Sequence, residues 1–300
     1  MSLKDKLRKL TPTFILEWNR QRKKRNRNAA LTAQKKKGKS YSQADLEEDL
    51  RTAGLKEGDL VLVHSSLSRI GHLADGPKTF VDALINVIGE RGTLAMPTSP
   101  NNVFQLNYIR NTPLFDVLNS PSKTGAITEY FRRLPDVMRS VHPTEPVSAI
   151  GPKADYLTKD HFGELTPYSE KSPFYRVSEQ GGKILYVGVT LSMAGTNLHT
   201  LEDAVDFKYP VYYAEDFEID VVDAEGKKHR VKTKVHNPVY SKKRRCDDLI
   251  PYFEEKGVLR HYPIGQANTL VIDAKGFFDA MIEGYQTKGI TMYTPYGSED

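Results

Sequence analysis

Beyond the first forty positions, the apolar residues switch between a helical spacing and short continuous runs. Residues 43–54 carry Leu46 and Leu50 on one helical face, and Ser42 precedes them with Asp45 three positions later, which is the pattern of a capped helix start. Runs of consecutive apolar residues then predict buried strands, with an amphipathic helix between them. The pattern predicts a β-loop-α-β unit of a parallel sheet, with its strand, helix and strand at 60–63, 78–88 and 93–97.

A comparable unit returns later in the chain. Residues 181–189 predict a turn and a buried strand, and residues 196–207 predict an amphipathic helix that Thr196 is placed to cap. After Pro210 the apolar residues alternate, which indicates an antiparallel hairpin around a turn at 224–226. The remaining pattern predicts a helix, two strands and a closing helix, at 247–256, 259–264, 269–272 and 277–285.

Together these elements predict an α/β fold with a mostly parallel central sheet, flanking helices and an antiparallel C-terminal β subdomain. We assign residues 42–300 to one domain, with a hairpin insertion at 210–245. Residues 97–180 lie between the two β-α units, are rich in Pro, Ser and Tyr, and contain one predicted helix at 124–134. Long irregular segments of this kind usually line a functional site.

Residues 1–41 differ from the rest of the chain in charge and in pattern. Apolar residues recur at helical spacing from Leu3 to Trp18, and a polybasic stretch follows. Residues 1–40 hold 14 Lys and Arg against two acidic residues, whereas residues 41–300 hold 29 basic and 36 acidic residues. The positive charge of the chain therefore belongs to an N-terminal arm, and the mildly acidic body is a poor nucleic-acid-binding surface.

Three roles for the arm remain open. It docks onto the body or a second copy of the chain, or it binds an anionic membrane through Phe14, Trp18 and its basic residues. Nucleic-acid binding is the least favoured, and we expect no nucleic-acid partner. Because no apolar run approaches the length of about 18 residues that a spanning helix needs, and no secretory leader is evident, we expect a cytoplasmic protein, at most peripheral at the inner membrane face.

Cysteine usage and missing motifs narrow the chemistry. Cys246 is the only cysteine, so neither an intrachain disulfide nor a Cys-rich zinc site can form, as is usual in a reducing compartment. The chain has no GxGxxG, GxSxG or HExxH motif, and GPKT at 76–79 lacks the upstream glycine and the spacing of a phosphate-binding loop. We expect neither nucleotide hydrolysis nor a metal centre.

Two loop segments carry candidate binding residues. HSSLSRIG begins at His64, where a buried strand ends, and open α/β sheets bind ligands at such positions. A serine-rich turn that closes the strand is the alternative. In SVHPTEPVSAIGP, His142 and Glu145 are flanked by two prolines that stiffen the backbone, and an ordinary ion pair in a loop is the alternative there.

Two further segments lie at predicted helix starts. Thr196, His199 and Glu202 follow a spacing of three, so they share one side of the helix, and the carboxylate can orient the imidazole as a general base. A capped helix start with one surface pair is the alternative. Residues 122–125 precede another helix, where unpaired backbone amides favour an anion and simple capping is equally compatible.

Taken together, these segments resemble the aminoglycoside 3-N-acetyltransferase family, the acetyl-CoA-dependent antibiotic N-acetyltransferases that do not have the GNAT fold. The resemblance covers most of residues 42–275. The motifs that carry it follow one another along the chain: HSSLSRIG at 64, GERGTLAMPT at 89, SKTGAITEYFRRLP at 122, RSVHPTEPVSAIGP at 139, SPFYRV at 172, GKILYVGV at 182 and TNLHTLED at 196.

The resemblance implies acetyl-CoA as co-substrate and assigns residues to two regions. It implies that the cofactor is contacted by the segment after the first strand and by two positions near it, namely His64, Ser65, Ser66, Ser68 and Ile70, with Gly76 and Thr93. It also implies that His199, Glu202 and His142 line the cleft where the substrate amine meets the thioester.

Acetyl transfer from a thioester to an amine needs no metal and no covalent nucleophile, but the amine must lose a proton. His199 braced by Glu202 suits direct transfer in a ternary complex, and acidic or polar side chains would hold a cationic acceptor. We assign Glu145, Thr196 and Asp203 to that second task. The acceptor is then an amino-sugar, either a deoxystreptamine antibiotic or a precursor of a surface polysaccharide. The alternative to an enzyme is a catalytically inactive binding protein that keeps the fold and acts through its basic arm.

Overall fold

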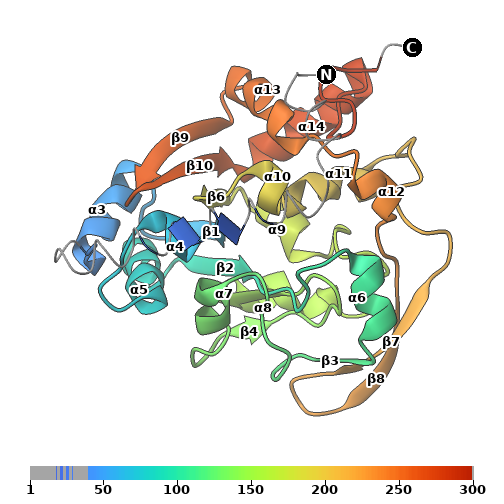
Figure 1. The fold of residues 1–300 in the computed structure, drawn as a ribbon, viewed down its shortest axis with the longest axis horizontal. Helices are drawn as coiled ribbons and strands as arrows, with labels where there is room; N and C mark the ends of the chain where they lie inside the picture. The colour runs from blue at the N-terminus through green and yellow to red at the C-terminus, as the bar shows by residue number, and fades with distance from the viewer. Residues whose placement is uncertain (1–17, 19–20, 23–24, 27–28, 30–39, 299–300) are drawn as a thin grey trace.

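The computed structural model describes residues 18, 21–22, 25–26, 29 and 40–298 (Figure 1). Except for Trp18, the predicted amphipathic segment of the arm therefore lies outside the described residues, as does most of the polybasic stretch after it. Within the described part of the chain, no helix combines the length and the apolar character that crossing a bilayer requires.

Seven strands form the central sheet within residues 40–298: β1 Leu60–Ser65, β2 Thr93–Pro97, β4 Met138–Arg139, β5 Val147–Ile150, β6 Lys183–Val187, β9 Leu259–Ile264 and β10 Ala267–Asp273. Their order is β4-β5-β2-β1-β6-β10-β9 (Figure 1). The three central strands, β2, β1 and β6, are parallel. On either side, β5 and β10 are antiparallel to their neighbours, and β4 and β9 reverse direction again. Five of the seven strands thus point one way, which confirms the predicted α/β class with a mostly parallel sheet.

The strands of this sheet bury both faces. Along β1, Leu62 packs into one core, whereas Val61 and Val63 pack into the other, as the two-residue period of a strand requires. One face is covered by α3 Gln43–Thr52, α4 Leu67–Ile70, α5 Pro77–Ile88 and α7 Ala126–Phe131. The other face is covered by α8 Ala154–Thr158, α9 Pro173–Glu179, α11 Thr200–Ala204, α13 Ile250–Glu255 and α14 Ala274–Lys288, with the 3₁₀ turn η3 Cys246–Leu249. A second 3₁₀ turn, η1 Lys159–His161, directly follows α8.

A separate three-stranded sheet contains the predicted hairpin. Its strands are β3 Leu114–Asp116, β7 Phe217–Val222 and β8 Lys228–Thr233, in that order, and α6 Gln105–Asn111 packs on them. The β7–β8 turn uses Gly226 at a positive φ of 81°, a conformation that glycine adopts without steric cost. β3 pairs parallel to β7 and was not predicted, since three residues are too few to show an alternation.

Three predicted helices differ from the observed ones. The helix predicted at 247–256 is the 3₁₀ turn η3 followed by the six residues of α13. The helix predicted at 124–134 is only the six residues of α7, and the helix predicted at 196–207 is a 3₁₀ turn, η2 Thr196–His199, followed by α11. The side chain of Thr196 caps neither of these, so that prediction is wrong. Its hydroxyl instead lies 3.4 Å from the imidazole of His64, because the chain is held here by contacts with β1 and not by local capping.

Candidate active site

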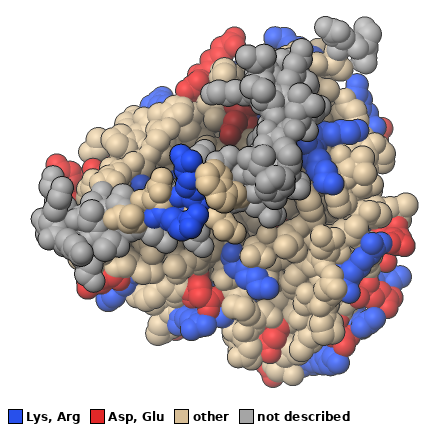
Figure 2. All heavy atoms as spheres, in the orientation of Figure 1, with Lys and Arg blue, Asp and Glu red and all other residues tan. Residues whose placement is uncertain are grey.

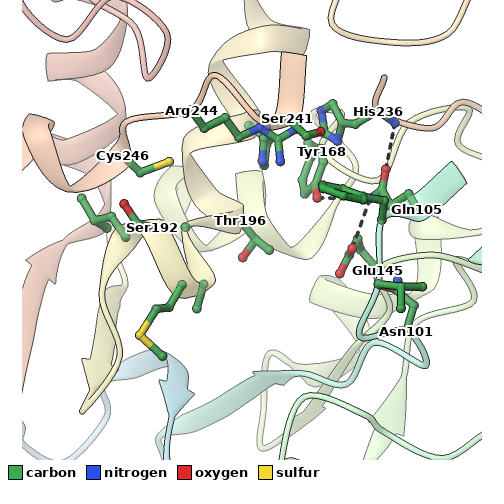
Figure 3. Close-up of a pocket in the computed structure, with 17 residues that line it drawn as sticks. Asn101, Gln105, Glu145, Tyr168, Ser192, Thr196, His236, Ser241, Arg244 and Cys246 are labelled. Carbon is green, nitrogen blue, oxygen red and sulfur yellow. Dashed lines mark hydrogen bonds between the residues drawn. The ribbon is translucent and has the colours of Figure 1, made fainter. Parts of the chain in front are cut away.

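The candidate site lies at the edge of the sheet where β1 and β6 end. Ser65 and Val187, the last residues of the two strands, are register partners, so the segments that follow them leave the sheet side by side. α4 follows β1, while the short helix α10 Leu191–Ala194 and η2 follow β6. Loops at the carboxyl ends of parallel strands are the usual ligand sites of α/β sheets, and Figure 3 shows the side chains that converge there.

Three adjoining cavities form a groove along this edge. The serine cavity, of about 780 Å³, is lined by the segment 65–68 and by Gly76 and Thr124. The middle cavity, of about 450 Å³, shares Ser65, Ser66 and Thr124 with it. The histidine cavity, of about 390 Å³, shares Glu145 and Thr196 with the middle cavity and contains His199 and His236. The lining residues that neighbouring cavities share show that the three cavities lie side by side along this edge, with the middle cavity between the other two.

A buried hydrogen-bond network forms the floor of the histidine cavity. The Nδ1–H of His199 and the Nε2–H of His236 both donate to Oε2 of Glu202, at 2.9 and 2.7 Å. The hydroxyl of Tyr293 donates to the other carboxylate oxygen at 2.7 Å. Because Nδ1 of His199 is held by the carboxylate, Nε2 is the ring nitrogen left to accept a proton.

In this network the carboxyl of Glu202 is ionised, whereas the imidazole of His199 is neutral. Burial lowers the pKa of His199 to about 3, so its imidazole is neutral at physiological pH. Burial opposes ionisation of Glu202, but the two histidines beside it hold the pKa of this carboxyl well below its usual value. The site therefore contains a neutral base next to a fixed negative charge, which stabilises the imidazolium when a proton arrives.

Aromatic rings hold the two histidines in place. Tyr168 stacks on His199 with ring centroids 4.7 Å apart, and Tyr212 stacks on His236 at the same separation. The two imidazoles lie 4.3 Å from each other. A ring packed on its face and hydrogen-bonded at its edge has little rotational freedom, so the base is oriented before a substrate binds.

Of the seven residues predicted to contact the cofactor, five line the groove: His64, Ser65, Ser66, Ser68 and Gly76. Two do not. Ile70 is fully buried in the core against the helices. Thr93 is the register partner of Leu60 at the start of the strands, at the opposite end from the groove, so its assignment is corrected as well.

His64 lies in the wall of the groove, where its ring contacts neighbouring parts of the fold. Its ring is buried, stacks on Tyr186 at 4.5 Å and has its Nε2 3.3 Å from the side-chain oxygen of Asn197. Burial lowers its pKa to about 4. His64 thereby ties the end of β1 to η2, the turn that carries His199.

Two of the three residues predicted to bind the acceptor line the groove. Thr196 and Glu145 lie where the middle and histidine cavities meet, and Glu145 accepts a hydrogen bond of 3.1 Å from Gln105. Burial raises the pKa of Glu145. Asp203 lines none of the three cavities, because its carboxylate faces away and accepts hydrogen bonds from Tyr212 and Thr166.

His142 does not share the site with His199. Its ring is fully buried, stacks on His161 at 4.6 Å and lines none of the three cavities. The backbone N–H and the hydroxyl of Thr144 lie 3.4 and 3.3 Å from Nδ1 of His142, so the ring is held inside the body. The structure therefore removes His142 from the candidate catalytic residues.

Three residues of the histidine cavity and its network were missed: His236, Arg244 and Tyr293. No spacing in the sequence links them to His199. His236 follows the hairpin, Arg244 lies between two short helices, and Tyr293 follows the last helix, so only the tertiary fold brings them together.

The histidine network could also be considered as a metal site. His199, Glu202 and His236 form the one group among the described residues whose ligand atoms, within 4.8 Å of one another, could hold an ion. Both imidazole N–H groups and a tyrosine hydroxyl are instead directed at the carboxylate. A carboxylate satisfied by three donors favours a role in orienting a base over one as a metal ligand.

Comparisons with known proteins agree with this architecture. Residues 62–286 match the family model described as "Aminoglycoside 3-N-acetyltransferase". Aminoglycoside N(3)-acetyltransferase VII of Streptomyces paromomycinus is 34% identical over 187 residues, which cover 55% of this chain and 64% of the relative. The chain thus spans just under two thirds of the length of the curated relatives it matches first.

Two solved structures are similar over most of their length. One, AAC-IIIb in a binary complex with CoASH, is 25% identical, with a TM-score of 0.69 over 82% of this chain and 96% of that chain. The other, AAC-VIa bound to sisomicin, is 29% identical, with a TM-score of 0.69 over 81% and 97%. The fold and groove define an α/β protein of the antibiotic N-acetyltransferase type. The chain belongs to the aminoglycoside 3-N-acetyltransferase family.

Proposed function

We propose that the protein transfers the acetyl group of acetyl-CoA to an amine of an amino-sugar. The groove carries this proposal: the serine cavity and the histidine cavity both adjoin the middle cavity, so we expect a thioester from one side to meet an amine from the other there. The relatives described above, one with CoASH and one with sisomicin, support the same two ligand classes.

In the proposed reaction the amine nitrogen attacks the thioester carbonyl carbon. A C–N bond forms, the C–S bond breaks, the proton lost by nitrogen passes to Nε2 of His199, and the imidazolium then gives that proton to the departing CoA thiolate. Nitrogen becomes strongly acidic once it has bonded to the carbonyl carbon, so a neutral imidazole with a low pKa can still accept its proton. Glu202 stabilises the resulting imidazolium.

The developing oxyanion needs a donor between the two ends of the groove. The hydroxyl of Ser65 is buried and has no hydrogen-bond partner among the described residues, and Ser65 lines both the serine and the middle cavities. The backbone N–H of Ser66 is already used by the carbonyl of Val187. We therefore assign the oxyanion to the Ser65 hydroxyl.

The test is His199→Ala assayed by thiol release from acetyl-CoA over a panel of amines. General-base catalysis typically accelerates a reaction by a factor on the order of 10² to 10⁴. We therefore expect kcat/KM to fall at least tenfold to a hundredfold in this variant, with unchanged CoA affinity. His229→Ala, on β8 and outside the groove, serves as the control. Wild-type activity in His199→Ala would refute the assignment, and CoA binding by the wild type without turnover of any amine would indicate a binding protein.

A further inference from the structure

Arg244 places a guanidinium in the histidine cavity, where a polycationic acceptor would not favour one. We propose that Arg244 binds an anionic group, a phosphate or a carboxylate, carried by the amine acceptor. The inference rests on the proposed acetyl transfer and narrows its substrate class to amines that also bear a negative charge.

The guanidinium is incompletely hydrogen-bonded. Its Nε lies 3.4 Å from the hydroxyl of Tyr293, at the outer limit of a hydrogen bond. Its Nη2 is buried and has no partner among the described residues. Figure 3 shows the side chain reaching into the cavity on the same side as Ser241 and Tyr168. A buried guanidinium N–H without an acceptor is costly, and an anion in the cavity would satisfy it.

The acidic groups nearby accept their hydrogen bonds from other residues. Glu202 acts on Arg244 only through its charge: burial opposes the ionised guanidinium, but Tyr293 and Glu202 together raise its pKa. The carboxylate of Glu202 accepts from His199, His236 and Tyr293. Glu145 accepts from Gln105, and burial raises its pKa, so its negative charge is disfavoured. Within residues 40–298, no salt bridge joins Arg244 to an acidic side chain.

The surface around the cavity adds positive charge. Arg244 belongs to the run Lys242, Lys243, Arg244, Arg245, directly after the short helix α12 Pro238–Ser241. Of the neighbours in this run, Arg245 is paired, with Asp248 at 2.6 Å. In the view of Figure 2, basic side chains gather at the position that α12 occupies in Figure 1. Such a field attracts anionic acceptors and repels antibiotics that carry only amines.

An acceptor that satisfies both ends of the cavity has an amine near Nε2 of His199 and an anionic oxygen near Arg244. Phosphorylated amino-sugars, nucleotide-linked amino-sugars and amino-sugar acids share this chemistry. The planar guanidinium can hold two oxygens of a phosphate or carboxylate at once, which fixes the orientation of the acceptor as well as its affinity.

The experiment compares matched acceptors: glucosamine, glucosamine 6-phosphate, muramic acid, a uridine-diphosphate-linked amino-sugar, and gentamicin. We expect kcat/KM to be at least tenfold higher for an anionic acceptor than for glucosamine. Arg244→Gln should remove that preference through KM of the acceptor and leave KM of acetyl-CoA unchanged. Comparison of the phosphate-bearing acceptors with the carboxylate-bearing one identifies which anion Arg244 binds. Lys243→Gln, a neighbour whose side chain is exposed, is the matched control.

Three results would overturn the inference while leaving acetyl transfer intact. One is equal or better use of glucosamine or gentamicin, another is an unchanged preference in a folded Arg244→Gln variant, and the third is a rise in KM of acetyl-CoA, which would assign the guanidinium to the cofactor. Turnover of no amine at all would instead refute the proposed function. Binding of glucosamine 6-phosphate measured by calorimetry, with and without Arg244, would then still test the anion site.

Discussion

Three hydrogen bonds converge on Glu202, a residue with no exposed side-chain surface. Each oxygen of the carboxylate is held by donors from a different part of the chain, so Glu202 fixes the position of His199 as much as its charge. Next to it in sequence, Asp203 points the other way and accepts from Tyr212 at 3.1 Å. Substitution of Glu202, with Asp203 as the control, can therefore separate an effect on the site from an effect on the fold.

We expect Glu202→Gln to lower kcat by about tenfold or more, since the amide still accepts from His199 but no longer stabilises an imidazolium. The loss should remain smaller than that of His199→Ala, and KM of acetyl-CoA should not change. Steady-state kinetics with both substrates varied would measure this. Asp203→Asn should retain wild-type rates, because its carboxyl, whose pKa burial raises to about 6, lies outside the groove. A similar loss in both variants would contradict the assignment.

The spacing of His199 and Glu202 was sufficient to predict their contact, because residues three apart meet in both α and 3₁₀ geometry. The same local reasoning failed for His142, whose direction depends on how a rigid loop packs on the body. It could not reach Arg244 or Tyr293 either, since their positions depend on the whole C-terminal half of the chain.

At the level of elements, the end of β1 is where the groove begins. The strand extends two residues beyond the predicted 60–63, so His64 and Ser65 are strand residues whose side chains alternate between faces. α4 then turns the chain so that Ser66 and Ser68 line the serine cavity. This short helix was not predicted, because four residues give no periodicity to detect.

Ser66→Trp is expected to fill the junction of the serine and middle cavities and to raise KM of acetyl-CoA by about tenfold or more, with kcat for the amine affected less. Ser192→Trp fills the histidine cavity at the other end of the groove and should raise KM of the amine instead. Calorimetric titration with CoA would check the first variant directly. Unchanged CoA affinity in Ser66→Trp would place the cofactor elsewhere.

Long periodic elements were predicted well and short ones poorly. The capping box at Ser42 and Asp45, the strands of the parallel centre and the β7–β8 hairpin follow local patterns, and the structure confirms them. By contrast, η2 and β3 span only a few residues and are formed by tertiary contacts, which override weak local preferences.

On the scale of the whole molecule, the body buries five histidines: His64, His142, His161, His199 and His236. Burial lowers the pKa of each, to about 4 for His64 and to about 3 for His142 and His199. The unfolded chain, in which histidine titrates near 6.5, therefore binds more protons than the folded protein at mildly acid pH.

We expect the free energy of unfolding to be nearly independent of these histidines above pH 7 and to decrease as the pH falls from 6.5 toward 4. Each proton taken up only by the unfolded state contributes up to about 1.4 kcal/mol per pH unit. Urea unfolding between pH 5 and 8 would measure the slope. His142→Gln, outside the groove, should flatten it, and an equally steep slope in that variant, or stability that rises on acidification, would contradict the explanation.

The role of the basic arm, residues 1–41, stays a prediction. Residues 1–17 and 30–39 lie outside the described part of the chain, and the body to which they are joined is acidic in net charge. The three predicted contacts of the arm, with an anionic membrane surface, a second copy of the chain or the body itself, therefore rest on the charge pattern of the sequence alone.

The groove has a consequence for the order of events. Its serine cavity and its histidine cavity lie at opposite ends of the middle cavity, and each has its own set of lining residues. In the proposed reaction, we therefore expect the cofactor and the acceptor to enter and depart independently, without either blocking the path of the other. We expect a random-order rate equation, in which free CoA binds at the serine cavity while a fresh acceptor is bound at the histidine cavity. Such dead-end complexes would slow the proposed transfer once product accumulates, so we expect the rate of acetylation to depend on the ratio of acetyl-CoA to CoA in the surrounding medium.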